Sequence, residues 1–223
     1  FKMVQKLSGK QFSLEALFLG LAGIIKETDN YALELKKEYE YLKHKYSITE
    51  KSLLKPQFFR LRPDNFPSIR LGQLAAVYAK RKHLFQDLMQ VQETKEIHKI
   101  FDIEISEYWK SHYNFGKSHP KRNKRLSRSF IELLIINCII PLKHCYQQHL
   151  GKESEKSIHS LLKDLKPERN TEIAVFFELR PDLPNTAMNS QALLQLRTQY
   201  CNSNKCLQCE LGASLLRKSP KYV

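Results

Sequence analysis

The chain has 223 residues, 42% of them hydrophobic, which is enough to bury a core and excludes a disordered tail. Its 37 Lys and Arg against 23 Asp and Glu give a formal net charge of +14, which favours polyanionic partners. Only 7 Gly and 9 Pro occur, and the long periodic stretches are rich in helix-forming residues. We therefore predict an all-α fold, an irregular multi-helix orthogonal bundle with at most one or two short strands.

The first part of the chain predicts a helical hairpin. Apolar residues recur every three or four positions over 14–25, behind Ser13 as a cap, and over 31–46, behind the cap cluster 28–30. Gly20 and Gly23, two small residues three apart, could permit close contact with another helix, or they could loosen their own helix.

A connector over 55–70 follows. It contains three prolines, so we expect an ordered, extended segment that ends where Pro67 starts a new helix. Arginine and amide side chains gather in and just after it: Arg60, Arg62, Asn65, Arg70 and Gln73. Arginine forks on a rigid loop can hold carboxylate or phosphate. They can equally pin the connector by pairing with carboxylates or capping carbonyls, and this structural role is the favoured interpretation.

The next segment, 101–109, alternates apolar and polar residues and is the best candidate for a strand. A basic stretch without any acidic residue follows over 108–131, and its candidate phosphate contacts are Lys117, Lys121, Arg122, Lys124, Arg125 and Arg128. His112, Tyr113 and Phe115 could add stacking on unpaired bases. The alternatives are a solvated basic loop and a contact with an acidic partner protein. If the chain forms two lobes, we expect them at 1–115 and 126–223, joined by the basic loop 116–125.

The longest apolar run, 130–142, contains Glu132 and Asn137 and reaches Pro141. We expect it to be too short and too interrupted to cross a bilayer of about 30 Å. It should instead form a buried helix that Pro141 kinks or divides. No membrane partner is expected.

Five cysteines, an odd number, fit a reducing cytoplasm better than a disulfide framework. Three of them, Cys201, Cys206 and Cys209, have the spacing C-x4-C-x2-C and could converge on zinc or an iron–sulfur cluster if a fourth ligand came from elsewhere. The favoured alternative is a set of reduced, partly buried thiols that close a loop. No motif of a P-loop, a dinucleotide fold, a zinc protease or a serine hydrolase occurs, so we expect no catalytic residue in this chain.

Four strings together resemble one family: SLEALFLGLAG from Ser13, FFRLRPDNFPSIRLGQLAA from Phe58, EYWKSHYNFG from Glu107 and SQALLQLRTQYCNSNKCLQCELG from Ser190. The chain is similar to the C-terminal half of the bacterial domain-of-unknown-function family DUF2851, whose full-length members carry an N-terminal half that resembles the PD-(D/E)XK nuclease core. The chain begins at Phe1 without a leader, which fits a piece of such a protein. The nuclease motif finds no matching positions here.

The resemblance implies a helical companion to a nuclease-like half that supplies DNA or RNA contacts or a scaffold. Nucleic-acid binding or scaffolding is thus the leading hypothesis. The alternatives are an interaction scaffold that docks its own N-terminal half, and a metal or redox centre built on the cysteines.

Overall fold

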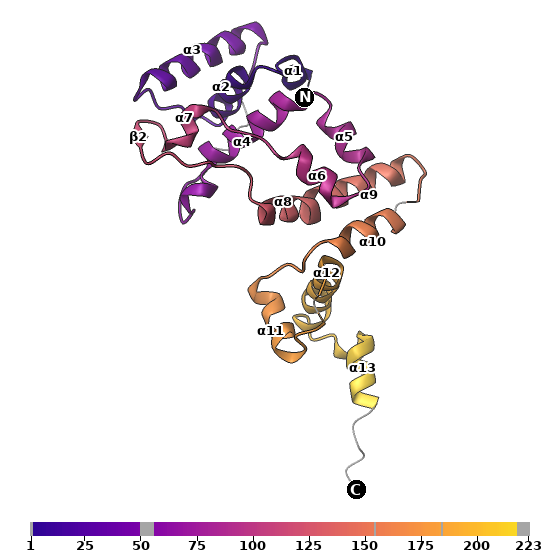
Figure 1. Cartoon of the computed structure of the whole chain (residues 1–223). Helices are drawn as coiled ribbons and strands as arrows, with labels where there is room; N and C mark the ends of the chain where they lie inside the picture. The colour runs from indigo at the N-terminus through magenta and orange to yellow at the C-terminus, as the bar shows by residue number, and fades with distance from the viewer. Residues whose placement is uncertain (1, 50–55, 154, 184, 218–223) are drawn as a thin grey trace. The chain divides into compact units, whose positions relative to one another are not determined.

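The computed structural model describes residues 2–49, 56–153, 155–183 and 185–217. The described chain is mostly helical, and its only sheet has two short antiparallel strands (Figure 1). The prediction of an all-α fold is therefore confirmed. Two compact units are formed, one by residues 1–91 and 95–131 and the other by 92–94 and 132–223. The basic segment 116–125 belongs to the first unit.

The helical elements of the first unit are, in chain order, α1 (Lys2–Lys6), α2 (Gln11–Leu21), α3 (Asn30–Lys45), the 3₁₀ helix η1 (Pro63–Asn65), α4 (Pro67–Lys80), α5 (Leu84–Gln90), α6 (Thr94–Ile100) and α7 (Glu107–Lys110). A hairpin of β1 (His112–Asn114) and β2 (Lys117–Ser118) follows, and α8 (Arg128–Leu134) starts at the end of the unit. The strand predicted over 101–109 is wrong, because that segment is irregular up to α7 and the strands lie in the hairpin.

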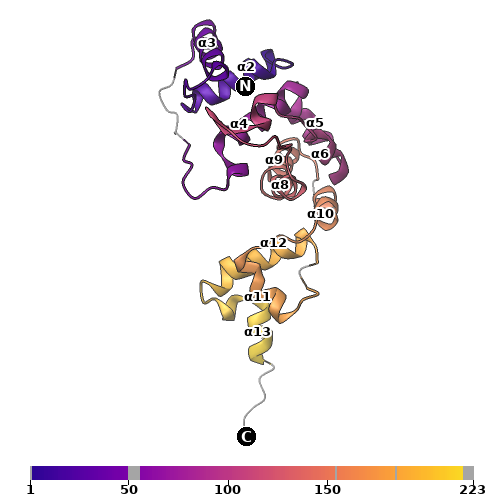
Figure 2. The ribbon, with the colours of Figure 1, turned by 60° about the vertical axis from the view of Figure 1, so that its left-hand side comes forward.

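Helix α2 is the centre of the first unit and packs against both α3 and α4 (Figures 1 and 2). Leu14 and Leu17 of α2 meet Leu42 of α3 and Ala75 of α4 in an apolar cluster. A Cβ atom added at Gly20 would lie 2.3 Å from ring carbons of Tyr39, so only glycine lets α2 and α3 approach this closely. Of the two alternatives for this glycine, close helix contact is the one observed.

The helix starts follow local capping chemistry. The carboxylate of Asp29 accepts the backbone N–H of the third residue on, at 2.8 Å, and so caps α3. Pro67 is the first residue of α4, as predicted. Ser13 is not a cap, because α2 begins two residues earlier and the Ser13 hydroxyl instead donates to Glu38 at 2.6 Å.

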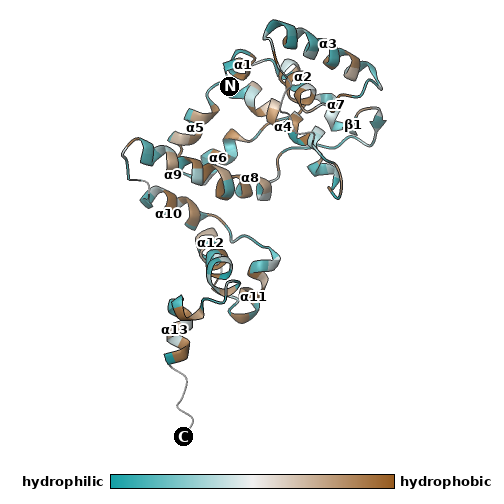
Figure 3. Ribbon diagram, turned by 180° about the vertical axis from the view of Figure 1, so that it is seen from behind, coloured by the Kyte–Doolittle hydropathy of each residue, from teal (hydrophilic) through white to brown (hydrophobic). Residues whose placement is uncertain are grey.

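The second unit contains the π-helical turn η2 (Ile135–Ile139), α9 (Ile140–His149), α10 (Glu155–Asp164), α11 (Thr171–Leu179), α12 (Ala187–Leu196), the π-helical turn η3 (Arg197–Cys201), the 3₁₀ turn η4 (Cys206–Gln208) and α13 (Glu210–Arg217). Helices α10 and α11 pack against α12. Leu161, Ile173 and Leu193 are buried where they meet. Figure 3 shows apolar residues on these helices interspersed with hydrophilic ones.

Segments α8, η2 and α9 form one continuous helix over Arg128–His149. Pro141 has no N–H to donate within the helix, and its ring would clash with the carbonyl four residues earlier. The wider π-helical turn just before Pro141 accommodates both the missing hydrogen bond and the ring. The helix therefore continues, and by length and composition alone it is long and apolar enough to span a membrane. The core helix of a soluble protein meets the same criterion.

Candidate functional site

A buried carboxylate fixes the elements that carry the site. Glu15 of α2 is fully buried, and it accepts hydrogen bonds from Trp109 Nε1 at 2.8 Å and from the Tyr31 hydroxyl at 2.5 Å. Ser106 and Gln11 donate to it at 3.2 Å each. Burial raises the pKa of Glu15, and these four donors oppose that rise. Through Trp109 the carboxylate holds α7, and therefore the start of the basic segment, against α2.

Lys124, in the middle of the basic segment, turns inward. Its side chain is buried, and its ammonium donates to the carbonyl oxygens of Trp109 and His112 at 2.6 Å each and lies 2.8 Å from His119 Nε2. The ammonium also lies 3.7 Å from the centre of the Tyr113 ring. Burial lowers the pKa of Lys124 to about 8. Instead of the predicted phosphate contact, Lys124 makes internal hydrogen bonds that hold the basic segment against α7 and the hairpin.

Two other predicted phosphate contacts form ion pairs. Lys121 lies 2.6 Å from Glu107, and Arg125 lies 2.6 Å from Glu104 and 3.3 Å from Asp102. All of these side chains remain largely exposed, so the pairs are weak and a ligand could compete for the cations. They nevertheless reduce the positive charge that the sequence alone predicted for this loop.

The remaining basic residues divide between two surfaces. Lys117 lies exposed on β2. Arg122 is exposed, and no carboxylate within the described ranges forms an ion pair with it. Arg128 opens α8 and lines a cavity of about 510 Å³ together with Arg125 and Lys99.

Arg70 is the centre of the arginine and amide cluster. Its guanidinium donates to Asn65 Oδ1 at 2.6 Å and to Gln73 Oε1 at 2.9 Å, and it lies 3.5 Å from the centre of the Phe130 ring. Gln73 is buried and donates from its Nε2 to the carbonyl of Lys124 at 2.8 Å. The arginine thus pins the connector, as the favoured interpretation predicted, but it does so through neutral amides. Arg60 and Arg62 lie exposed outside this cluster.

The structure joins the two groups of residues that the sequence singled out. A polar cavity of about 170 Å³ is lined by side chains from η1, α4 and the basic segment, including Asp64, Asn65, Arg70, Gln73, Arg122, Lys124 and Arg125. Arg70 and Lys124 have neutral hydrogen-bond partners. Asp64 is the acidic residue of the lining, and its carboxylate accepts the Tyr113 hydroxyl at 3.0 Å. The cavity therefore carries a net positive charge suited to an anion.

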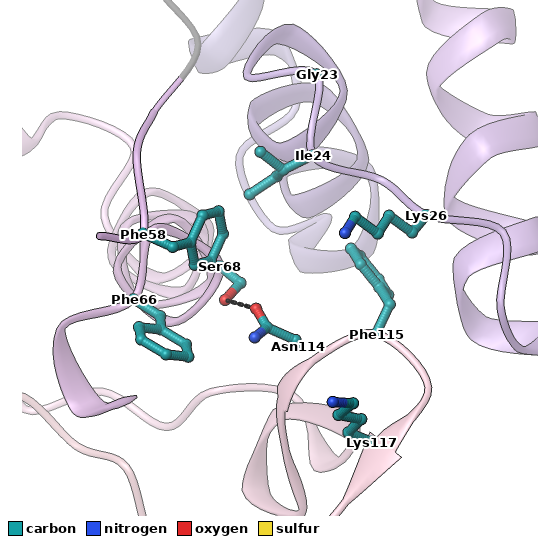
Figure 4. Close-up of a pocket in the computed structure, with 9 residues that line it drawn as sticks. All are labelled: Gly23, Ile24, Lys26, Phe58, Phe66, Ser68, Asn114, Phe115 and Lys117. Atoms are coloured by element: carbon teal, nitrogen blue, oxygen red, sulfur yellow. Dashed lines mark hydrogen bonds between the residues drawn. The ribbon is translucent and has the colours of Figure 1, made fainter. Parts of the chain in front are cut away.

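A further cavity, of about 490 Å³, is lined by Phe58 and Phe66, which flank η1 in the chain, and is mostly apolar. Figure 4 shows Phe58 and Phe66 on one side of it and Phe115 on the other, with Ser68 and Asn114 between them. Two lysines, at 26 and 117, also line this cavity. We call it the aromatic cavity, and the cavity around Arg70 and Arg122 the polar cavity.

The cysteine cluster does not assemble as the metal hypothesis requires. Cys201 and Cys206 are exposed whereas Cys209 is buried, so the three thiols face different surroundings. Throughout the part of the chain that the structure describes, no three His, Cys, Asp or Glu residues lie close enough to hold a metal ion. Zinc and iron–sulfur ligation by Cys201, Cys206 and Cys209 thus has no support in this geometry.

Residues 1–171 match the sequence profile of a family described as "Protein of unknown function (DUF2851)". The chain belongs to this family. The match covers the whole first unit and therefore both cavities. No curated protein and no solved structure matches the chain.

Sequence reasoning missed the residues that complete the two cavities. Lys26 was unremarkable in a loop, and Phe58 and Ser68 carried no motif. The string FFRLRPDNFPSIR did contain the signal, because it places three phenylalanines, three arginines and an asparagine around a rigid proline-rich turn. Only the fold shows that residues in and next to η1 line both an apolar cavity and a cationic one.

Proposed function

We propose that the first unit of this DUF2851 protein binds single-stranded nucleic acid and seats a backbone phosphate in the polar cavity. The observation that carries the proposal is the charge of that cavity. Arg70 is held by neutral amide groups, and Arg122 has no carboxylate partner among the described residues. Clustered cations that outnumber the carboxylates around them attract phosphate.

The three elements around the cavity support a positioned phosphate contact over a merely solvated basic loop. A solvated loop needs no fixed partners, yet Gln73 ties the loop to α4 through the Lys124 carbonyl and Arg70 is oriented by two amides. A guanidinium fork held in this way loses less conformational entropy when it binds an oxyanion.

Within the full-length protein, we propose that this region is a nucleic-acid-binding companion of a nuclease-like segment in a bacterial cytoplasm. It needs no catalytic residue of its own for that role. Neither a membrane nor a resident metal is part of this proposal.

Fluorescence anisotropy with a labelled oligothymidylate tests the proposal. Arg122→Gln should weaken binding about 10-fold, because a charge-assisted hydrogen bond to phosphate contributes about 1.5 kcal/mol or more. Arg180→Gln is the matched control: it removes one positive charge from an exposed arginine of the second unit that pairs with Asp182. Equal weakening by both substitutions would show that only the overall charge matters and would contradict a phosphate seat.

A second candidate function is a docking scaffold, which the surface of α13 favours. Leu211, Leu215 and Leu216 are each more than half exposed on this short helix. Exposed apolar side chains spaced in this way are typical of a helix face that a partner covers, here another segment of the full-length protein. Replacement of Leu211 and Leu215 by Glu should abolish copurification with that partner segment. Unchanged copurification would exclude α13 as the docking face.

A further inference from the structure

We infer that the aromatic cavity is a seat for one unpaired nucleobase of the strand whose phosphate enters the polar cavity. The inference rests on the proposed function, because the phosphate contact would hold the strand beside η1. The cavity volume of about 490 Å³ lies in the range of about 300–1,000 Å³ that is typical of small-molecule pockets. The residues that line this cavity favour a nucleobase over other small molecules.

The rings that would contact the base are held by other rings. Phe66 packs edge-to-face on Phe58, with ring centres 5.3 Å apart, and on Tyr113, at 6.5 Å. Phe115 is buried and packs edge-to-face on Trp109 at 5.1 Å. Because Trp109 is itself fixed by Glu15, Phe115 is anchored to the core of the unit. A base would therefore meet aromatic surfaces that are already in place, which reduces the entropy lost on stacking.

The polar groups of the aromatic cavity match the edge of a base. The Ser68 hydroxyl donates to the Tyr113 carbonyl at 2.5 Å and lies 3.4 Å from Asn114 Oδ1 (Figure 4). The Asn114 side chain also carries an NH₂ group, which is a hydrogen-bond donor. Every natural base offers a carbonyl oxygen or a ring nitrogen that accepts such a bond. The side chains of Phe and Trp offer no such acceptor.

The two cavities are adjacent along the chain and share a support. Asp64 and Asn65 line the polar cavity, whereas Phe66 lines the aromatic cavity. Tyr113 connects them, because its hydroxyl donates to Asp64 and its ring contacts Phe66. Lys26 lies exposed at the aromatic cavity and supplies a cation for a further phosphate of the same strand. A strand that passes along η1 can thus place a base in the aromatic cavity and a phosphate in the polar cavity.

Two labelled strands test the inference: an oligothymidylate and the same strand with an abasic sugar at every position, which keeps the phosphates and removes the bases. The intact protein should bind the abasic strand about 5-fold to 100-fold more weakly, the range expected for loss of base–aromatic stacking. Phe58→Ala should remove most of this preference. Phe59→Ala is the matched control, because Phe59 is 75% exposed and does not line the cavity.

The outcomes separate this inference from the proposed function. If neither strand binds, the nucleic-acid function itself fails. If both strands bind equally and lose affinity as salt rises, the phosphate seat stands and the base seat is overturned. Photocrosslinking with a 5-iodouracil strand does not depend on a folded variant. It should label peptides within 56–70 or 113–117, and labels confined to other segments would overturn the base seat.

Discussion

Replacement of Lys124 by Met should destabilise the first unit, although the sequence places this lysine among surface cations. The substitution removes the donor from two carbonyl oxygens, the buried one of Trp109 and the partly buried one of His112. Each buried acceptor left without a donor costs about 1–3 kcal/mol. The flexible apolar side chain of Met fills much of the vacated volume, and a buried charge disappears, so both effects offset part of the loss. We expect a net loss of about 2–4 kcal/mol in the free energy of unfolding.

Urea unfolding followed by tryptophan fluorescence measures this loss. Trp109 is the single tryptophan of the chain and is fully buried in the first unit, so its emission reports on that unit. With a denaturant slope of about 1–3 kcal/mol per molar urea, the midpoint should fall by about 1–2 M. The exposed Lys82, changed to Met, provides the control. A midpoint for the Lys124 variant within about 0.3 M of the wild type would refute the internal role.

The pH dependence of the same measurement has a definite sign. Burial lowers the pKa of Lys124 to about 8 in the folded chain. Between this pH and the ordinary pKa of lysine, the unfolded chain therefore holds a proton that the folded chain has released. The free energy of unfolding of the wild type should therefore rise with pH above about 8, and the advantage over the Met variant should widen. Buried Tyr31, whose pKa is raised, acts in the opposite direction only above about pH 10. A constant difference between the two proteins from pH 8 to 9.5 would contradict the assignment.

Three further predictions concern the scaffold of the site. Glu15→Leu leaves the donors of Trp109 and Tyr31 without an acceptor, and it should lower the free energy of unfolding in urea by about 3–5 kcal/mol. Glu15→Gln should cost less. It should also remove the loss of stability that we expect in the wild type as pH rises through the raised pKa of Glu15. Gly20→Ala should cost about 2–3 kcal/mol because its Cβ would overlap the Tyr39 ring, and Gly151→Ala, which meets no neighbour, should cost only the smaller strain of a positive φ. In Arg70→Lys, the lysine cannot reach Asn65 and Gln73 together. This variant should bind the oligonucleotide more weakly, with little change in the unfolding midpoint. Wild-type affinity in this variant would exclude Arg70 from the phosphate seat.

The helices were predictable where a local rule decides them. The Asp29 cap and the start of α4 at Pro67 depend on residues next to one another, and both follow from the sequence. The inward turn of Lys124 was not predictable, because its acceptors are carbonyls of α7 and the hairpin, and the local pattern around it is that of a solvated cationic loop. Glu15 was likewise overlooked, since its donors Tyr31 and Trp109 come from distant parts of the chain.

The pairing of Arg70 with neutral amides was also hidden in the sequence. Arginine near asparagine and glutamine is compatible with many arrangements, and carboxylates elsewhere could have neutralised it. Only the packing of η1 against α4 shows that Asn65 and Gln73 occupy its donors, while Asp64 is the acidic residue of the cavity that acts on its charge. The cluster around Arg70 is therefore both a structural support of the connector and a candidate anion site.

The dependence of oligothymidylate affinity on salt tests the central claim most directly. Each phosphate contact on a single strand contributes about 0.7 to the slope of log affinity against log salt concentration. Arg122→Gln should lower that slope by about this amount, and Arg180→Gln should leave it unchanged. A wild-type affinity that does not fall with salt, or a slope that is the same in both variants, would contradict a phosphate seated between Arg70 and Arg122.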